Sequence, residues 1–140
     1  VYDFDNSPAV RKLAGRIAAE RGLHIYSVFK IPYAERCFSL CGPENFLGLV
    51  QGADFVLSNS FHATAFSVIF EREFAVVERT EKINTRMRDF TTMLGLSDHM
   101  VTTETGIPAG TDWTAVRRCL KDEIDHAKAY IDEVLRDVER

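Results

Sequence analysis

The order of strands and helices in this sequence predicts an α/β fold: a doubly wound, Rossmann-like parallel sheet that spans residues 1–140 as a single domain. Two observations lead to this fold class. Short apolar runs alternate with stretches of helical length along the chain. One of the runs, DFVLS at residues 54–58, lacks polar alternation, which is typical of a strand buried on both faces. We therefore expect helices on both faces of the sheet.

The first helix is predicted over residues 7–22, SPAVRKLAGRIAAERG. Ser7 fits the N-cap, Pro8 suits the first helical position because an N–H there has no partner, and Gly22 marks the end. LHIYSV at residues 23–28 is rich in side chains that suit a pleated strand. The loop expected after this strand contains Pro32, Cys37 and Cys41.

The middle of the chain alternates regularly between predicted helices and strands. GPENFLGLVQGA at residues 42–53 carries proline and glutamate in its first turn, as helix starts do. After the strand at 54–58, residues 60–70 have helical length and are apolar nearly all round, which predicts a helix buried between layers. FAVVE at 74–78 is the next predicted strand.

Two further helices are predicted in the remaining chain. TRMRDFTTMLGL at residues 85–96 ends near Gly95, and a long helix begins near Asp112. One apolar seam runs along the long helix, at steps of three and four residues: Val116, Leu120, Ile124, Ala127, Ile131, Leu135 and Val138. The seam predicts either a helix that docks across the domain or a dimerising coil, so a homo-oligomer stays open.

Composition limits the class of partner. The 17 basic and 21 acidic side chains give a net charge of −4, which offers no general attraction to nucleic acid or to anionic membrane. No apolar run approaches the ~20 residues of a membrane span, and the first residues lack a signal-peptide pattern. An odd number of cysteines, three, fits a reducing compartment. We expect a cytoplasmic protein without a transmembrane segment.

The sequence predicts no metal and no bound cofactor. The pair Cys37 and Cys41 has no second pair at metal-ligand spacing, and neither do the histidines at positions 24, 99 and 126. There is no glycine-rich phosphate loop of the kind that binds ATP or NAD. The chain begins at Val1 with VYDF, which resembles the end of a strand, so we expect an N-terminal domain of the same protein to hold part of the site.

Function is expected at the junction SNSFHAT, residues 58–64, where a predicted strand passes into a predicted helix. Ligands of doubly wound sheets bind beyond the carboxyl ends of the strands, at helix N-termini that favour anions. Short polar side chains are supplied there by Ser58, Asn59, Ser60 and Thr64. His62, in the first helical turn, suits hydrogen bonding to an anion or proton transfer near neutral pH. The structural alternative is that Ser60 is only an N-cap and His62 a buried ring bonded to backbone.

The stretch PENFLGLVQGADFVLSNSFHATAFSVIFEREFAVV resembles the core motif of the polysaccharide pyruvyl transferase family. In that motif a P-E-x-F-L helix precedes an apolar strand, a (T/S)-(D/N)-S-F-H-(G/A)-(T/L) junction and an F-S-(I/L)-I-F-x-x-x-F helix. The likeness continues more weakly to about residue 120. It implies the C-terminal, donor-binding domain of a larger two-domain transferase with a fold like that of GT-B glycosyltransferases.

The resemblance also implies chemistry and site residues. Family members transfer the enolpyruvyl group of phosphoenolpyruvate to a saccharide hydroxyl, in exopolysaccharide or cell-surface glycan synthesis. By position in the motif, His62 would be the general acid or a donor to phosphoenolpyruvate. The backbone of Ser60, Phe61 and Ala63 would approach this donor. Ser60 stands where some members carry arginine, and Ala63 where many carry glycine.

Phosphoenolpyruvate carries both a phosphate and a carboxylate, so at least one arginine is expected beside the helix N-terminus. The candidates are Arg79, just after the strand at 74–78, and Arg86, at the start of the next helix.

Two other functions stay open. The chain would also suit the donor-binding half of a nucleotide-sugar glycosyltransferase, in which Glu78 or Glu81 holds the ribose. A third hypothesis is a non-catalytic saccharide-binding or assembly module that acts through the long C-terminal helix.

Overall fold

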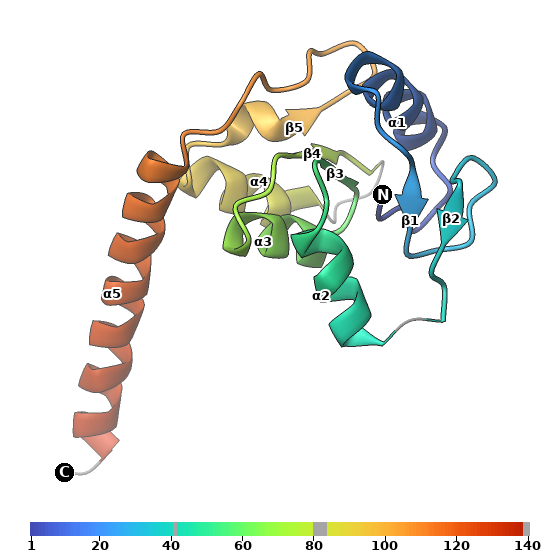
Figure 1. The fold of residues 1–140 in the computed structure, drawn as a ribbon. Coiled ribbons are helices and arrows are strands. Elements are labelled where there is room, and N and C mark those ends of the chain that lie inside the picture. The colour runs from blue at the N-terminus through green and yellow to red at the C-terminus, as the bar shows by residue number, and fades with distance from the viewer. Residues whose placement is uncertain (41, 80–83, 139–140) are drawn as a thin grey trace.

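The computed structural model describes residues 1–40, 42–79 and 84–138, with side chains as far as Arg136 (Figure 1). Its elements in chain order are α1 (Pro8–Arg21), β1 (Tyr26–Ser27), β2 (Arg36–Cys37), α2 (Pro43–Gln51), β3 (Val56–Ser58), α3 (Phe61–Ile69), β4 (Phe74–Val77), α4 (Thr85–Met93), the 3-10 helix η2 (Ser97–His99), β5 (Met100–Val101) and α5 (Trp113–Val138). Mixed α/β architecture, as predicted, is confirmed.

The backbone of Val1 and Tyr2 joins two parallel sheets. One sheet has the order β1-β2 and the other the order β3-β4-β5. Val1 exchanges hydrogen bonds of 2.6 and 3.4 Å with the backbone at β1. Tyr2 pairs in parallel with β3, donating to Leu57 O at 2.9 Å and accepting from Asn59 N at 3.1 Å. The resulting order, β2-β1-(Val1–Tyr2)-β3-β4-β5, is compatible with a Rossmann-like fold.

Helices cover both faces of the central strands because successive strand side chains point to opposite sides. Val56, Phe74 and Val76 face the cluster that α2, α3, α4 and the start of α5 complete. Leu57, Ala75 and Val77 face the cluster that α1 completes. The predicted burial of β3 on both faces is confirmed, and β4 is buried in the same way.

The predicted helix starts and stops agree closely with the structure in the first half of the chain. Gly22 ends α1 with a left-handed φ of 65°, a conformation that glycine adopts without strain. Ser7 occupies the N-cap position, but its side chain makes no capping hydrogen bond. The helices predicted at 42–53, 60–70 and 85–96 are α2, α3 and α4.

Several short elements differ from the sequence predictions. The strand expected at 23–28 is only Tyr26–Ser27, and β2 lies in the predicted loop. Neither β5 nor η2 was predicted, because elements of two or three residues are too short to show a period in the sequence. The helix α3 is not buried all round, since Ile69 is 60% exposed.

His99, which the sequence analysis considered only as a metal ligand, is a core residue. It ends η2 and is 1% exposed. Its Nδ1 lies 2.9 Å from the carbonyl oxygen of Phe74, and its ring packs on the ring of Phe74 with centroids 4.4 Å apart. The side chain therefore has a packing role.

The prediction that the last helix docks across the domain is wrong beyond its first turns. Trp113, Val116 and Leu120 pack on the core, and the helix then projects away from it (Figure 1). At 26 residues, α5 is ~39 Å long and outreaches the nine-residue helices beside it. Its apolar side chains beyond that point are exposed at Ile124, Tyr130, Ile131, Val134 and Leu135. The dimerising coil stays a prediction.

Over the part of the chain that the structure describes, no helix has the combination of length and apolar character that crossing a membrane requires.

Replacement of Leu13 by alanine tests the core assignment. Leu13 is 1% exposed in the cluster beneath α1, so Leu13→Ala should lower the free energy of unfolding by about 2–5 kcal/mol in urea denaturation. Leu135→Ala is the matched control at a 56% exposed position and should change it by less than about 0.5 kcal/mol. Equal losses for the two variants would contradict the exposure of α5.

Candidate anion-binding site

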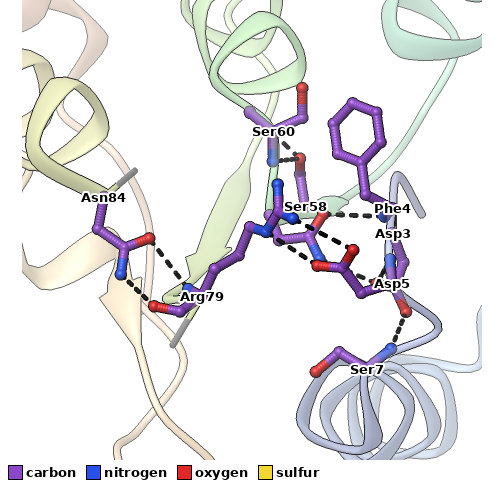
Figure 2. Close-up of polar contacts among 9 residues, drawn as sticks. Asp3, Phe4, Asp5, Ser7, Ser58, Ser60, Arg79 and Asn84 are labelled. Carbon is purple, nitrogen blue, oxygen red and sulfur yellow. Dashed lines mark hydrogen bonds and ion pairs between the residues drawn. The ribbon is translucent and has the colours of Figure 1, made fainter. Parts of the chain in front are cut away.

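The polar residues of the predicted site follow strands that lie side by side. The Val1–Tyr2 segment and β3 are neighbours in the sheet, and the helices that follow them lie on opposite faces: α1 covers one face and α3 the other. In parallel sheets such a switch point opens a crevice at the carboxyl ends of the strands. The segments Asp3–Asp5, Ser58–Ser60 and Glu78–Arg79 lie at the carboxyl ends of neighbouring strands. Figure 2 shows Asp5, Ser60 and Arg79 at this edge.

Hydroxyl groups at the β3–α3 junction hold the turn itself. The Oγ atom of Ser58 accepts a hydrogen bond from the Ser60 backbone N–H at 2.8 Å. Thr64 Oγ1 donates to the carbonyl oxygen of Ser60 at 2.9 Å. The side chain of Ser60 does not cap α3. Partial burial raises the pKa of Tyr2, and the neighbouring Ser60 side chain offsets part of that rise. Ser58, Ser60 and Thr64 are all buried, so they shape the junction.

Asp3 was missed by the sequence analysis and is the centre of the polar network. Its side chain is 1% exposed. Oδ1 accepts from Asn59 Nδ2 at 2.9 Å and from Asp5 N at 3.3 Å. Oδ2 accepts from Ser7 N and from the Tyr33 hydroxyl, both at 2.8 Å. Four donors compensate the buried carboxylate and tie the end of β3 to the start of α1.

A sequence signal for Asp3 did exist, because an acidic residue directly after the apolar start of the chain lies at the carboxyl end of a strand. Its partner Asn59 is 56 residues away, however, so only the fold shows the contact. Asn59, predicted as a ligand residue, is buried and also accepts from Phe4 N at 3.1 Å.

Arg79 reaches across the end of β3 toward Asp5, as Figure 2 shows. Its Nη2 donates to Asp5 Oδ1 at 3.2 Å, and its Nε lies 2.8 Å from Asp5 Oδ2 as an ion pair without hydrogen-bond geometry. The guanidinium also lies 5.6 Å from the centre of the Phe4 ring. Its backbone N donates to Asn84 Oδ1 at 3.0 Å, and its carbonyl accepts from Asn84 Nδ2.

His62 is an exposed residue in the first turn of α3. None of the residues that the structure describes forms a hydrogen bond with its ring, and its one ring contact is with Phe61, 6.3 Å away between centroids. The alternative of a buried ring bonded to backbone is therefore wrong. Arg86, exposed on α4, places its guanidinium 5.4 Å over the same Phe61 ring. Phe61 thus links the histidine to the second predicted arginine.

The structure thereby brings both arginines to the β3–α3 junction, Arg79 on the side of Asp5 and Arg86 on the side of Phe61. Ala63 is fully buried in the core, so neither its methyl group nor its backbone is exposed at the junction. Contact of any of these residues with a donor stays a prediction.

Two acidic residues, Glu78 and Glu81, were predicted as alternatives for ribose binding, and this stays a prediction. Glu78 is in an ion pair with Arg88, with Oε1 and Nη2 2.7 Å apart. Glu81 lies outside the described residues, as does Cys41. Cys37 and Cys119 are free thiols. Among the residues with described positions, no three His, Cys, Asp or Glu side chains gather as metal ligands would.

A cavity of about 500 Å³ lies elsewhere in the domain. Its lining is largely apolar. It includes residues 23–25, just before β1, and residues 53–55, just before β3, so the cavity lies toward the amino ends of these strands. No arginine or lysine is among the described residues that line it. We place the functional site at the polar edge, because an anionic ligand needs cations and free donors.

Fold and site together define a mixed α/β domain with parallel sheets, compatible with a Rossmann-like fold, that carries polar and arginine side chains at the carboxyl ends of its central strands. The family model of polysaccharide pyruvyl transferase matches residues 1–81, and this stretch is more than half of the 140-residue chain. The chain belongs to the polysaccharide pyruvyl transferase family. Comparison with curated proteins gives no match, and neither does comparison with solved structures.

The family match confirms the resemblance and changes its extent. It begins at residue 1, so it includes α1 and the Asp3–Asp5 segment, and it ends at residue 81. The weaker likeness expected up to residue 120 is not part of it. The His62 junction lies well inside the matched stretch.

Removal of the Asp3 carboxylate should destabilise the domain. Asp3→Ala leaves buried donors without an acceptor, so we expect a loss of about 3 kcal/mol or more in the free energy of unfolding. The matched control Asp5→Ala removes a half-exposed carboxylate and should cost less than about 1 kcal/mol. Comparable urea midpoints for the two variants would show that Asp3 is not the centre of the network.

Stability should fall in alkali because of Tyr33. Burial, and donation of its hydroxyl to Asp3, raise the pKa of Tyr33 well above its usual value near ~10. As the pH rises, the unfolded chain therefore loses the phenol proton of Tyr33 before the folded chain does. The stabilising contribution of Tyr33 is fully present below about pH 10 and is lost above it. Tyr33→Phe should flatten the decline in thermal midpoint above about pH 10. Tyr130→Phe, at an exposed position, should not. An unchanged slope in Tyr33→Phe would contradict the assignment.

Proposed function

We propose that this chain carries the donor site of a cytoplasmic enzyme that transfers a pyruvyl group from phosphoenolpyruvate to a saccharide hydroxyl, in exopolysaccharide or cell-surface glycan synthesis. The observation that carries the proposal is His62: an exposed ring in the first turn of α3, at the switch point, in a member of the pyruvyl transferase family. An exposed histidine at that place is available for chemistry.

The start of α3 offers a site for one anionic group of the donor. The first intrahelical bond runs from Thr64 N to Ser60 O, so the N–H groups of the half-buried Phe61 and the exposed His62 have no partner one turn earlier in the helix. Because Ser60 makes no side-chain cap, these donors and the positive end of the helix dipole can receive a phosphate.

The arginines would supply the second contact. A carboxylate matches the planar guanidinium of arginine, which binds it through two parallel hydrogen bonds. Arg79 already holds a carboxylate, that of Asp5, in two contacts. Arg86 is stacked on Phe61 and is exposed, which leaves its guanidinium N–H groups free to reach a ligand beside His62.

His62 would start the reaction by protonating the methylene carbon of the donor. The carbon that bears the phosphate then becomes oxocarbenium-like, and a saccharide hydroxyl adds to it. The phosphate leaves with the electrons of its C–O bond, and a second hydroxyl closes the ketal. Of the two hydroxyl protons, one replaces the proton that His62 gave and the other leaves with phosphate. Imidazole is the side chain most often used as a general acid or base, which suits His62 to the first step.

In this scheme the chain is the C-terminal, donor-binding half of a GT-B-like enzyme. An N-terminal domain of the same protein would bind the saccharide acceptor across the crevice. No bound cofactor is required, because phosphoenolpyruvate itself brings the reactive group.

Replacement of His62 tests the proposal directly. His62→Ala should lower kcat for pyruvyl transfer by about 10²–10⁴-fold, the usual contribution of a positioned general acid. His126→Ala replaces an exposed histidine on α5 and should leave kcat unchanged. Release of phosphate from phosphoenolpyruvate in the presence of acceptor is the measurement. Full turnover in His62→Ala would remove His62 from the mechanism.

A further inference from the structure

We infer that Asp5 competes with the donor for Arg79, so that the crevice selects ligands able to replace an internal carboxylate. The inference deepens the proposed function and rests on it. It assigns to Asp5 a role in specificity: the carboxylate of the chain occupies the place that the carboxylate of phosphoenolpyruvate takes when it binds.

The two partners of this ion pair are held very differently. The side chain of Arg79 is 21% exposed, whereas that of Asp5 is 52% exposed. Arg79 is fixed at its backbone by both polar atoms of the Asn84 side chain, and its guanidinium lies against the Phe4 ring. An exchange of carboxylates would therefore move Asp5 and leave Arg79 in place.

Asp5 lies in an exposed turn in which its backbone N–H is held by Asp3 Oδ1 at 3.3 Å, so the exchange requires movement of its side chain alone. The next residue, Asn6, has a positive φ of 49°, and Phe4, Asp5 and Asn6 are all exposed. Beneath them, Asp3 and Ser7 are tied together by the hydrogen bond from Ser7 N to Asp3 Oδ2. The turn is anchored at both ends, so a shift of Asp5 need not disturb α1 or β3.

The exchange makes the site selective for a ligand with two anionic groups. A ligand that brings phosphate alone can bind the start of α3 and leave the Arg79–Asp5 pair intact. A ligand that also brings a carboxylate displaces Asp5 and gains a guanidinium that is already positioned. Displacement of Asp5 breaks one half-exposed ion pair, and this loss lowers the binding constant by only a small factor.

A double-mutant cycle measures the competition. Dissociation constants for phosphoenolpyruvate and for inorganic phosphate would be measured by isothermal titration calorimetry on the wild type, Asp5→Asn, Arg79→Gln and the double variant. Asp5→Asn should bind phosphoenolpyruvate about twofold to fivefold more tightly, the size of an exposed ion pair, and inorganic phosphate unchanged. In the Arg79→Gln background, Asp5→Asn should have no effect on phosphoenolpyruvate.

The control for net charge is Asp54→Asn, because Asp54 is exposed and precedes the opposite end of β3. It should leave both dissociation constants as they are. A merely structural role for Asp5 predicts weaker binding in Asp5→Asn, which is the opposite sign.

Each outcome separates the two proposals. If the wild type binds phosphoenolpyruvate and Asp5→Asn binds it equally or less tightly, the role of Asp5 is wrong and the proposed function stands. The same holds if the gain persists in the Arg79→Gln background or appears in Asp54→Asn. If no variant binds phosphoenolpyruvate, both the proposed donor and the role of Asp5 are wrong.

Discussion

The buried carboxylate of Asp3 is the interaction on which the crevice depends. An isolated charge is costly to bury, and here four hydrogen-bond donors compensate it. Those donors come from the end of β3, from the start of α1 and from Tyr33, so one side chain fixes three segments that are distant in sequence. The polar edge at the carboxyl ends of these strands is therefore held in place by this buried network.

The structure divides the predicted site residues into two groups. Ser58, Asn59, Ser60 and Thr64 are buried and bonded to one another or to the chain around them. They hold the β3–α3 junction in the shape that exposes the first turn of α3. His62 and Arg86 are exposed, and Arg79 is partly so. Chemistry is thus assigned to the side chains that the junction presents, while the buried junction residues hold its shape.

Patterns within the sequence predicted what local structure determines. The uninterrupted apolar runs of β3 and β4 gave the buried strands, and Pro8 and Gly22 gave the limits of α1. The family motif gave the place of His62. Contacts between distant segments were beyond such patterns: Asp5 and Arg79 are 74 residues apart, and only the parallel order of the strands brings them together. The seam of α5 was visible in the sequence, but a period of 3.5 residues does not say what covers an apolar face.

A nuclear magnetic resonance titration tests the central claim most directly, that the β3–α3 junction binds phosphoenolpyruvate. The backbone amides of residues 58–64 would be followed with phosphoenolpyruvate, UDP and inorganic phosphate in turn. The account predicts shifts at these amides and at Arg79 and Arg86 that are largest for phosphoenolpyruvate and weaker in His62→Ala. A response at the junction that is selective for UDP would contradict it and favour a nucleotide-sugar donor.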